Sequence, residues 1–182
     1  MSGIVGDNVA RASGVIAAAG GGGKLLQVVQ YVRTATSGST GSTSMTDITD
    51  FKVAITPAAE SSKMLVSFNI AAGSSGAGQH FQITRDIAGG GFSTLTDFIG
   101  DSRGSRTRVT AGSIGIGTTL MVPFTQQCLD TPSYSSGDEI TYQMQWYQES
   151  PYTGWINRQS SNADNYYNDT QISTMTVMEI GA

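Results

Sequence analysis

Apolar and polar residues alternate with a period of two along most of the chain after residue 24. Successive side chains of a β-strand point to opposite faces of the sheet, so this period predicts strands with one buried face. A solvated second face is typical of antiparallel sheets. The clearest cases are two segments whose apolar residues share a face: Met64, Val66, Phe68 and Ile70 in KMLVSFNI, and Ile140, Tyr142, Met144 and Trp146 in EITYQMQWYQ.

The same alternation, less regular, recurs between turns rich in Gly, Ser, Thr, Asn and Asp, while helical periodicity is absent. The connections are long enough to cross between sheets. We therefore predict an all-β fold, a two-sheet antiparallel jelly-roll sandwich of about 8–10 strands, and not a tight-hairpin barrel. Pro123 cannot donate to a ladder, so its strand is expected at an edge or a bulge. The predicted strands cover residues 25–33, 51–56, 63–70, 81–85, 92–99, 120–125, 139–148, 154–158 and 172–180.

Four consecutive glycines at residues 20–23 divide the chain, because such a run favours neither helix nor strand. We expect residues 1–23 to form an extended N-terminal arm with a glycine hinge, and residues 24–182 to form the sandwich. The arm is more apolar than most soluble tails but too small for a core of its own. It is either a disordered terminus or a segment that orders only against another subunit.

Composition excludes several classes of function. Only 13% of the residues are charged and the net charge is −4, which argues against binding to nucleic acid. No segment approaches the ~20 apolar residues of a membrane span, so we expect no membrane insertion. The single cysteine, Cys128, cannot form an intrachain disulfide and is interpreted as a packing residue.

The second face of the predicted strands is unusually neutral. A monomer usually keeps Lys and Glu on its exposed sheets, whereas interfaces between subunits are depleted in charge and enriched in Tyr and Met. We therefore expect much of this face to be buried between identical subunits. The residues assigned to it are Gln27, Tyr31, Gln143, Gln145, Tyr147, Met175 and Val177.

The chain is poor in residues that carry catalysis. His80 is the only histidine and has no Asp or Glu within three residues, which leaves too few ligands for a metal. The carboxylates are dispersed, and no spacing predicts the paired acids of a glycosidase. We predict a protein without catalytic residues, cofactor or metal; a polysaccharide depolymerase is the enzymatic alternative.

Residues 152–171 are the most suggestive stretch for binding, because aromatic rings stack on sugar faces and amides bond to sugar hydroxyls. Three interpretations stay open: an ordinary loop stabilised by Asn and Asp turns, a contact with neighbouring subunits, and a glycan or ion site. Asp164 and Asp169 with nearby carbonyls would be the ligands of a calcium ion, although the spacing matches no EF-hand. The candidate receptor or glycan residues are Trp155, Asn157, Arg158, Asp164, Tyr166, Tyr167 and Asp169.

A local basic cluster comprises Arg103, Arg106 and Arg108. It is a candidate contact for a phosphate or an acidic sugar. Asp97 and Asp101 lie just upstream, so a solvated loop with local ion pairs is the favoured interpretation.

Five phrases, in this order along the chain, resemble a group of small virion proteins from tailed bacteriophages, especially marine and cyanobacterial phages: MSGIVG, KLLQVVQ, ITPAAESSKMLVSFNI, GWINRQSS and TMTVMEIGA. The resemblance covers most of the chain. It implies a fibre-like or head-decorating virion component whose jelly roll is similar to the trimeric tumour-necrosis-factor-like sandwiches. It implies no catalytic residue, because such proteins share none.

From the resemblance we expect a homotrimer on the surface of the phage particle. Residues 1–23 would attach it to other virion proteins of the capsid or tail, and the sandwich would face outward. The leading hypothesis is a short tail fibre or receptor-binding head that binds host surface polysaccharide. The alternative is a capsid decoration protein that stabilises the head. The short glycine run leaves little room for a shaft and speaks against a long fibre.

Overall fold

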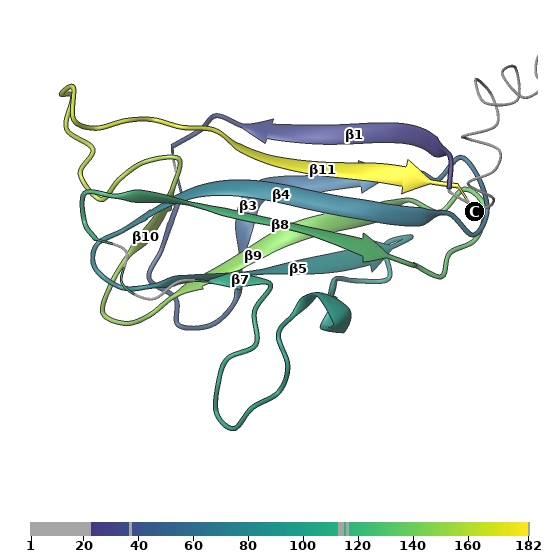
Figure 1. Ribbon diagram of the computed structural model, residues 1–182, viewed down its shortest axis with the longest axis horizontal. Coiled ribbons are helices and arrows are strands. Elements are labelled where there is room, and N and C mark those ends of the chain that lie inside the picture. The colour runs from purple at the N-terminus through teal and green to yellow at the C-terminus, as the bar shows by residue number, and fades with distance from the viewer. Residues whose placement is uncertain (1–22, 37, 113–114, 116, 182) are drawn as a thin grey trace, which may run out of the picture.

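The computed structural model describes residues 23–181 apart from 37, 113, 114 and 116, so the predicted arm lies outside the described residues except for Gly23. The described chain forms two antiparallel sheets packed face to face (Figure 1), which confirms the predicted all-β sandwich. The elements are β1 (Leu25–Arg33), β2 (Ser39–Thr40), β3 (Thr46–Ile55), β4 (Lys63–Ser74), β5 (Gln79–Ile87), β6 (Ser93–Thr94), the 3-10 helix η1 (Thr96–Phe98), β7 (Ala111–Gly112), β8 (Met121–Asp130), β9 (Ile140–Gln148), β10 (Gly154–Ile156) and β11 (Ser173–Ile180).

The first sheet is organised around β4, its longest strand. One edge of β4 pairs with β8 over residues 64–73. The other edge pairs with β11 over residues 63–69 and then with β10 over residues 72–74. β1 extends the sheet beyond β11, and β2 extends it beyond β10. The second sheet has the order β3-β9-β5-β6, with β7 also paired to β5.

Apart from β5 and β6, the strands that pair within a sheet are not consecutive in the sequence. The chain passes from β1 to β3, back to β4, across to β5, and repeats this crossing from β8 to β9 to β11. Such crossing between two antiparallel sheets is the connectivity of a jelly roll. It brings residues of β5 and β8 to the same open side of the sandwich, which positions the cavity described below.

The core lies between the two sheets and is lined by the alternate residues of each long strand. Both sets of inward residues expected in β4 and β9 are buried, which confirms the face assigned to these strands. Complete burial of such a side chain contributes about 1.5–3 kcal/mol. The further large core side chains are Phe51, Phe81, Ile83 and Ile156.

Two local expectations have different outcomes. Among the described strands β8 pairs only with β4, so Pro123 lies on an edge strand as expected. The prediction of a strand over residues 92–99 is wrong. Only Ser93 and Thr94 pair with β5, and the chain then turns into η1.

The residues assigned from the sequence to the outer, second face of the strands are partly wrong. Met175 and Val177 are fully buried in the core, and Tyr31 packs against it, with its ring 5.8 Å from Phe51. Gln143 and Tyr147 do lie on the outward side of β9, where they are largely covered. The outward positions of β1 and β11 are instead the even-numbered ones.

Candidate functional site

The segment that follows β10 is anchored by Asn157. This residue is buried and has a φ of 61°, a left-handed conformation that Asn tolerates better than most residues. Its side-chain amide donates to the Arg33 carbonyl at 2.8 Å and the Ala35 carbonyl at 3.2 Å, and its oxygen accepts from the Ser173 hydroxyl at 2.6 Å. Asn157 therefore joins the end of β1 to the start of β11, and its side chain is not available to a receptor.

Trp155 and Arg158 form the base of the same loop. The Arg158 guanidinium lies 4.7 Å from the centre of the Trp155 ring, a cation–π contact. Arg158 also donates to the carbonyls of Gln159 and Ser160 at 3.0 and 3.1 Å. Burial lowers the pKa of this guanidinium, and the side chain keeps its charge because arginine titrates far above neutral pH. Both residues are half-buried, so they support the loop more than they extend from it.

The tip of the loop presents two aromatic rings. Tyr166 is 83% exposed and Tyr167 is 69% exposed. Their ring centres are 3.8 Å apart, and the Tyr166 hydroxyl donates to that of Tyr167. The Asn168 amide fixes the turn beneath them by donating to the Ala163 carbonyl at 2.7 Å. The rings therefore stand on a loop with its own hydrogen-bond network.

Asp164 and Asp169 line a cavity of about 160 Å³ on the inner side of this loop, together with Arg158. Among residues 23–181, with the stated gaps, no three His, Cys, Asp or Glu side chains group together as metal ligands. A guanidinium in the same cavity also opposes a cation. Nothing in the described loop favours the calcium interpretation.

This loop and the start of the sandwich lie at opposite ends of β4. β10 pairs with residues 72–74 of β4, whereas Ile180 pairs with Lys63 at its beginning. The Gly181 amide donates to the Lys24 carbonyl at 2.8 Å, which fixes the first described residues beside the C-terminal end. At about 3.3 Å per residue, the two ends of β4 are roughly 30–35 Å apart. In Figure 1 the yellow-green loop projects at the end of the sandwich opposite to the C mark.

The three arginines of the basic cluster lie on the long loop between η1 and β7, which projects below the sandwich in Figure 1. Arg103 and Arg106 are exposed, and Arg108 donates through Nε to the Gly100 carbonyl at 2.6 Å. The expected local ion pairs are absent. In the described residues the close contacts between basic and acidic side chains lie elsewhere, between Arg85 and Asp130 and between His80 and Glu149. The structure brings no buried polar group to this cluster that would define an anion site.

His80 and Cys128 occupy ordinary structural positions. The His80 ring stacks on Tyr147 with 4.3 Å between ring centres, and its Nε2 lies 3.4 Å from a Glu149 oxygen. Cys128 is a half-buried thiol on β8 whose pKa is raised by burial, so it is a poor nucleophile.

The outward face of the first sheet carries a continuous apolar row that crosses four strands. The register aligns Val28 of β1 with Met178 of β11, then Leu65 of β4, then Leu129 of β8. Val28 is 51% exposed and Leu129 is 48% exposed. The next rows contain Gln, Thr, Ser and Asn, together with exposed Val32. Within these four strands, all of which are fully described, Lys63 is the only charged residue on this face. We refer to these outward residues of β1, β11, β4 and β8 as the neutral face.

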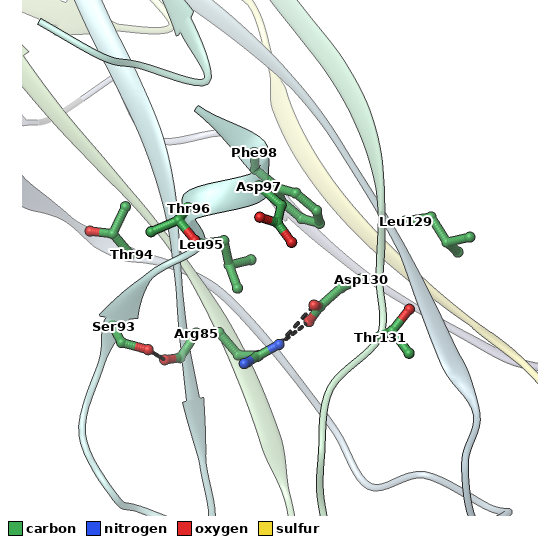
Figure 2. A pocket seen from close by; sticks show the side chains of 10 residues that line it. All are labelled: Arg85, Ser93, Thr94, Leu95, Thr96, Asp97, Phe98, Leu129, Asp130 and Thr131. Carbon is green, nitrogen blue, oxygen red and sulfur yellow. Dashed lines mark hydrogen bonds and ion pairs between the residues drawn. The ribbon is translucent and has the colours of Figure 1, made fainter. Parts of the chain in front are cut away.

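A second cavity, of about 260 Å³, opens between the edges of the two sheets. Arg85 of β5 and Asp130 of β8 meet in its wall, and Asp97 of η1 faces the same space (Figure 2). The sequence does not predict this cavity. Arg85 and Asp130 are 45 residues apart and come from different sheets, so no motif or spacing relates them.

Comparison with known proteins gives no identity: no protein-family model matches the chain, and no curated protein matches it. None of the described residues forms a helix of the length and apolarity that a membrane crossing requires.

Proposed function

We propose that this chain is a non-enzymatic structural protein of a tailed-phage virion, and that it acts as a short fibre or receptor-binding head. The observation that carries the proposal is the exposed Tyr166–Tyr167 pair on a loop at the end of the sandwich opposite to Gly23. A head anchored through residues 1–23 would present this end outward. The sequence resemblance supports the virion role, and the geometry supports recognition at the distal end.

The chemistry of the loop tip suits a saccharide of the host surface. Tyrosine rings offer apolar faces to the C–H groups of sugars and hydroxyls for hydrogen bonds. Asp164, Asn165 and Asn168 of the same loop add carboxylate and amide groups in the cavity beneath it. The loop's own hydrogen bonds hold the rings in position before binding, which lowers the entropic cost of recognition.

Self-association through the neutral face is part of the same proposal. An exposed sheet face with a single charged residue, Lys63, is unfavourable in a monomer, because charged residues normally keep exposed sheets apart. Burying the row of Val28, Met178, Leu65 and Leu129 against other copies removes this liability. A closed assembly of three copies, as the resemblance implies, would present three distal loops in parallel and strengthen weak binding to each saccharide.

The test of the recognition role compares binding to host cells and to isolated host surface polysaccharide. We expect the Tyr166→Ala, Tyr167→Ala variant to lose binding at least tenfold while its thermal unfolding is unchanged. Phe92→Ala is the matched control, because Phe92 is also an exposed aromatic residue but lies outside the distal loop. Equal binding by wild type and the tyrosine variant would refute recognition by this loop.

The capsid-decoration alternative predicts a different result. Particles that lack the protein would then release DNA on heating, and the tyrosine variant would restore them as well as wild type. The depolymerase alternative predicts that reducing ends are released from host polysaccharide. Deletion of residues 1–19 tests attachment: the domain should fold and bind cells but fail to join the particle.

A further inference from the structure

The cavity between the sheet edges has a fixed charged base. Arg85 Nη1 donates to both carboxylate oxygens of Asp130, at 2.7 and 2.6 Å. The buried Tyr142 hydroxyl donates to the same carboxylate at 2.6 Å. Burial and the adjacent carboxylate raise the pKa of Tyr142, so its phenol remains a donor. The Asp130 oxygens are therefore committed to protein partners.

Three further polar side chains of the wall have no protein partner among the described residues, whereas Ser93 and Thr94 are bonded to Arg85 and Gln82. Asp97, Thr96 and Thr131 line the cavity, and within the described part of the chain no side-chain hydrogen bond or ion pair involves any of them. Figure 2 shows the Asp97 carboxylate and the Asp130 carboxylate facing the same space, with the Phe98 ring beside Asp97. These residues form a set of acceptors and donors beside an apolar surface.

The charges of the wall restrict the chemistry of a ligand. Two carboxylates, Asp97 and Asp130, oppose a phosphate, sulfate or uronic acid. The Arg85 guanidinium opposes an ammonium group or a metal ion, and it already balances the charge of the Asp130 carboxylate. What fits is a neutral ligand rich in hydroxyl groups, which can donate to Asp97 and accept from the threonine hydroxyls.

We propose that this cavity binds one ring of a neutral sugar. The Asp97 carboxylate accepts hydrogen bonds from two adjacent ring hydroxyls, Thr96 and Thr131 contribute further hydrogen bonds, and Phe98 packs against the C–H face. The cavity of about 260 Å³ lies just below the range of roughly 300–1,000 Å³ typical of drug-sized ligands, which suits a single ring. For a ligand of this size we expect a dissociation constant of roughly millimolar.

The site is separate from the distal loop, although Leu129 of the neutral face also lines it, and the inference does not depend on the proposed recognition role. The experiment is saturation-transfer NMR with glucose, galactose, mannose, N-acetylglucosamine and N-acetylgalactosamine, followed by titration of any sugar that gives a signal. It uses the Tyr166→Ala, Tyr167→Ala variant as well as wild type. We expect at least one sugar to bind, and both proteins to bind it equally.

Asp97→Ala and Thr96→Val should each weaken that binding at least tenfold. The matched control is Asp101→Ala, because Asp101 is also exposed but its oxygen accepts from the Ser102 amide, and it does not line the cavity. Asp97 is exposed, so its replacement should leave thermal unfolding unchanged. The inference is overturned if no sugar of the panel binds, if Asp97→Ala binds as tightly as wild type, if only the tyrosine variant loses binding, or if inorganic phosphate binds more tightly than the sugars.

Discussion

Replacing Glu179 by Gln tests how the structure places a carboxylate inside the sandwich. Glu179 is fully buried on the inward side of β11. Its two oxygens accept from the Ala58 and Ala59 amides at 2.9–3.1 Å, from the Ser62 hydroxyl at 2.7 Å and from the Gln27 amide at 2.6 Å. The carboxylate thus fastens the β3–β4 connection to β11 and β1.

Glutamine has the same shape but replaces one accepting oxygen by a donating NH₂. Whichever way the amide turns, it presents a donor to groups that are themselves donors. A hydrogen bond to a charged group contributes about 1.5–3 kcal/mol, and an unpaired buried donor costs about 1–3 kcal/mol. Because one or two of these hydrogen bonds would be broken, we expect Glu179→Gln to lower the free energy of unfolding by about 2–4 kcal/mol.

The assay is urea unfolding at neutral pH, followed by tryptophan fluorescence and circular dichroism. The matched control is Glu60→Gln, an exposed carboxylate in the same connection, for which we expect a change within about 0.5 kcal/mol. A Glu179→Gln variant as stable as the control would refute the reasoning, since it would mean that the carboxylate does not hold the connection.

The same substitution should also change how the free energy of unfolding depends on pH. Burial alone would raise the pKa of the Glu179 carboxyl, but the hydrogen bonds from Ala58, Ser62, Gln27 and Ala59 outweigh it, so the pKa lies below its ordinary value. A carboxylate with a depressed pKa in the folded state contributes stability that is complete above about pH 4.3 and is lost as pH falls through the folded value. Wild type should therefore lose its advantage over Glu179→Gln as the solution is acidified below about pH 4.3. A constant difference between the two proteins from pH 7 to pH 3 would contradict the assignment.

Three further substitutions test the packing. Phe68→Ala should lower the free energy of unfolding by about 3–5 kcal/mol, because it leaves a void between the sheets; near-native urea stability would show that the core is placed wrongly. Tyr142→Phe should cost about 1–2 kcal/mol through loss of its buried hydrogen bond, and a more stable variant would argue against that bond. Gly154→Ala should cost about 1–3 kcal/mol, since its methyl group would collide with the Gln79 side-chain amide. Gly100→Ala, where the space is open, is the control, and equal melting temperatures for the two would contradict the close packing.

The sequence predicts where each long strand lies, because the alternation is visible over many residues, but β3 and β8 are longer than the predicted ranges 51–56 and 120–125. The predicted limits of β1 agree with the structure at both ends. β2 and β7 were missed, since a ladder of two residues is too short to show a period. The strand expected at residues 92–99 fails for a different reason: its apolar residues do not keep a strict period of two, and only Ser93 and Thr94 pair with β5 before the chain turns.

Periodicity also cannot say which face of a strand is inward when both faces contain apolar residues. In β11 the inward face carries Met175, Val177 and Glu179. The outward face carries Met178 and Ile180, which are also apolar. A glutamate at such a position favours the wrong face, unless its partners on the β3–β4 connection are known. The assignment of Met175 and Val177 to an outer surface was wrong for this reason.

The candidate sites, too, could be predicted only in part from the sequence. Composition selected residues 152–171 as a candidate site, but it could not separate Asn157, which is buried and structural, from the exposed Tyr166 and Tyr167. That difference depends on the φ of Asn157 and on the strands it joins. The cavity that contains Arg85 and Asp130 depends on the order of strands in two sheets, which no local pattern reveals.

The central claim is that copies of this chain associate through the neutral face. The most direct measurement is sedimentation velocity at micromolar concentration of wild type, of Val28→Lys, Leu129→Lys, and of a control, Ala54→Lys, which adds a charge at an exposed position on β3 of the other sheet. We predict that wild type and the control sediment with the mass of three chains and that the double variant is a folded monomer. A monomeric wild type, or a double variant that still assembles, would contradict the account.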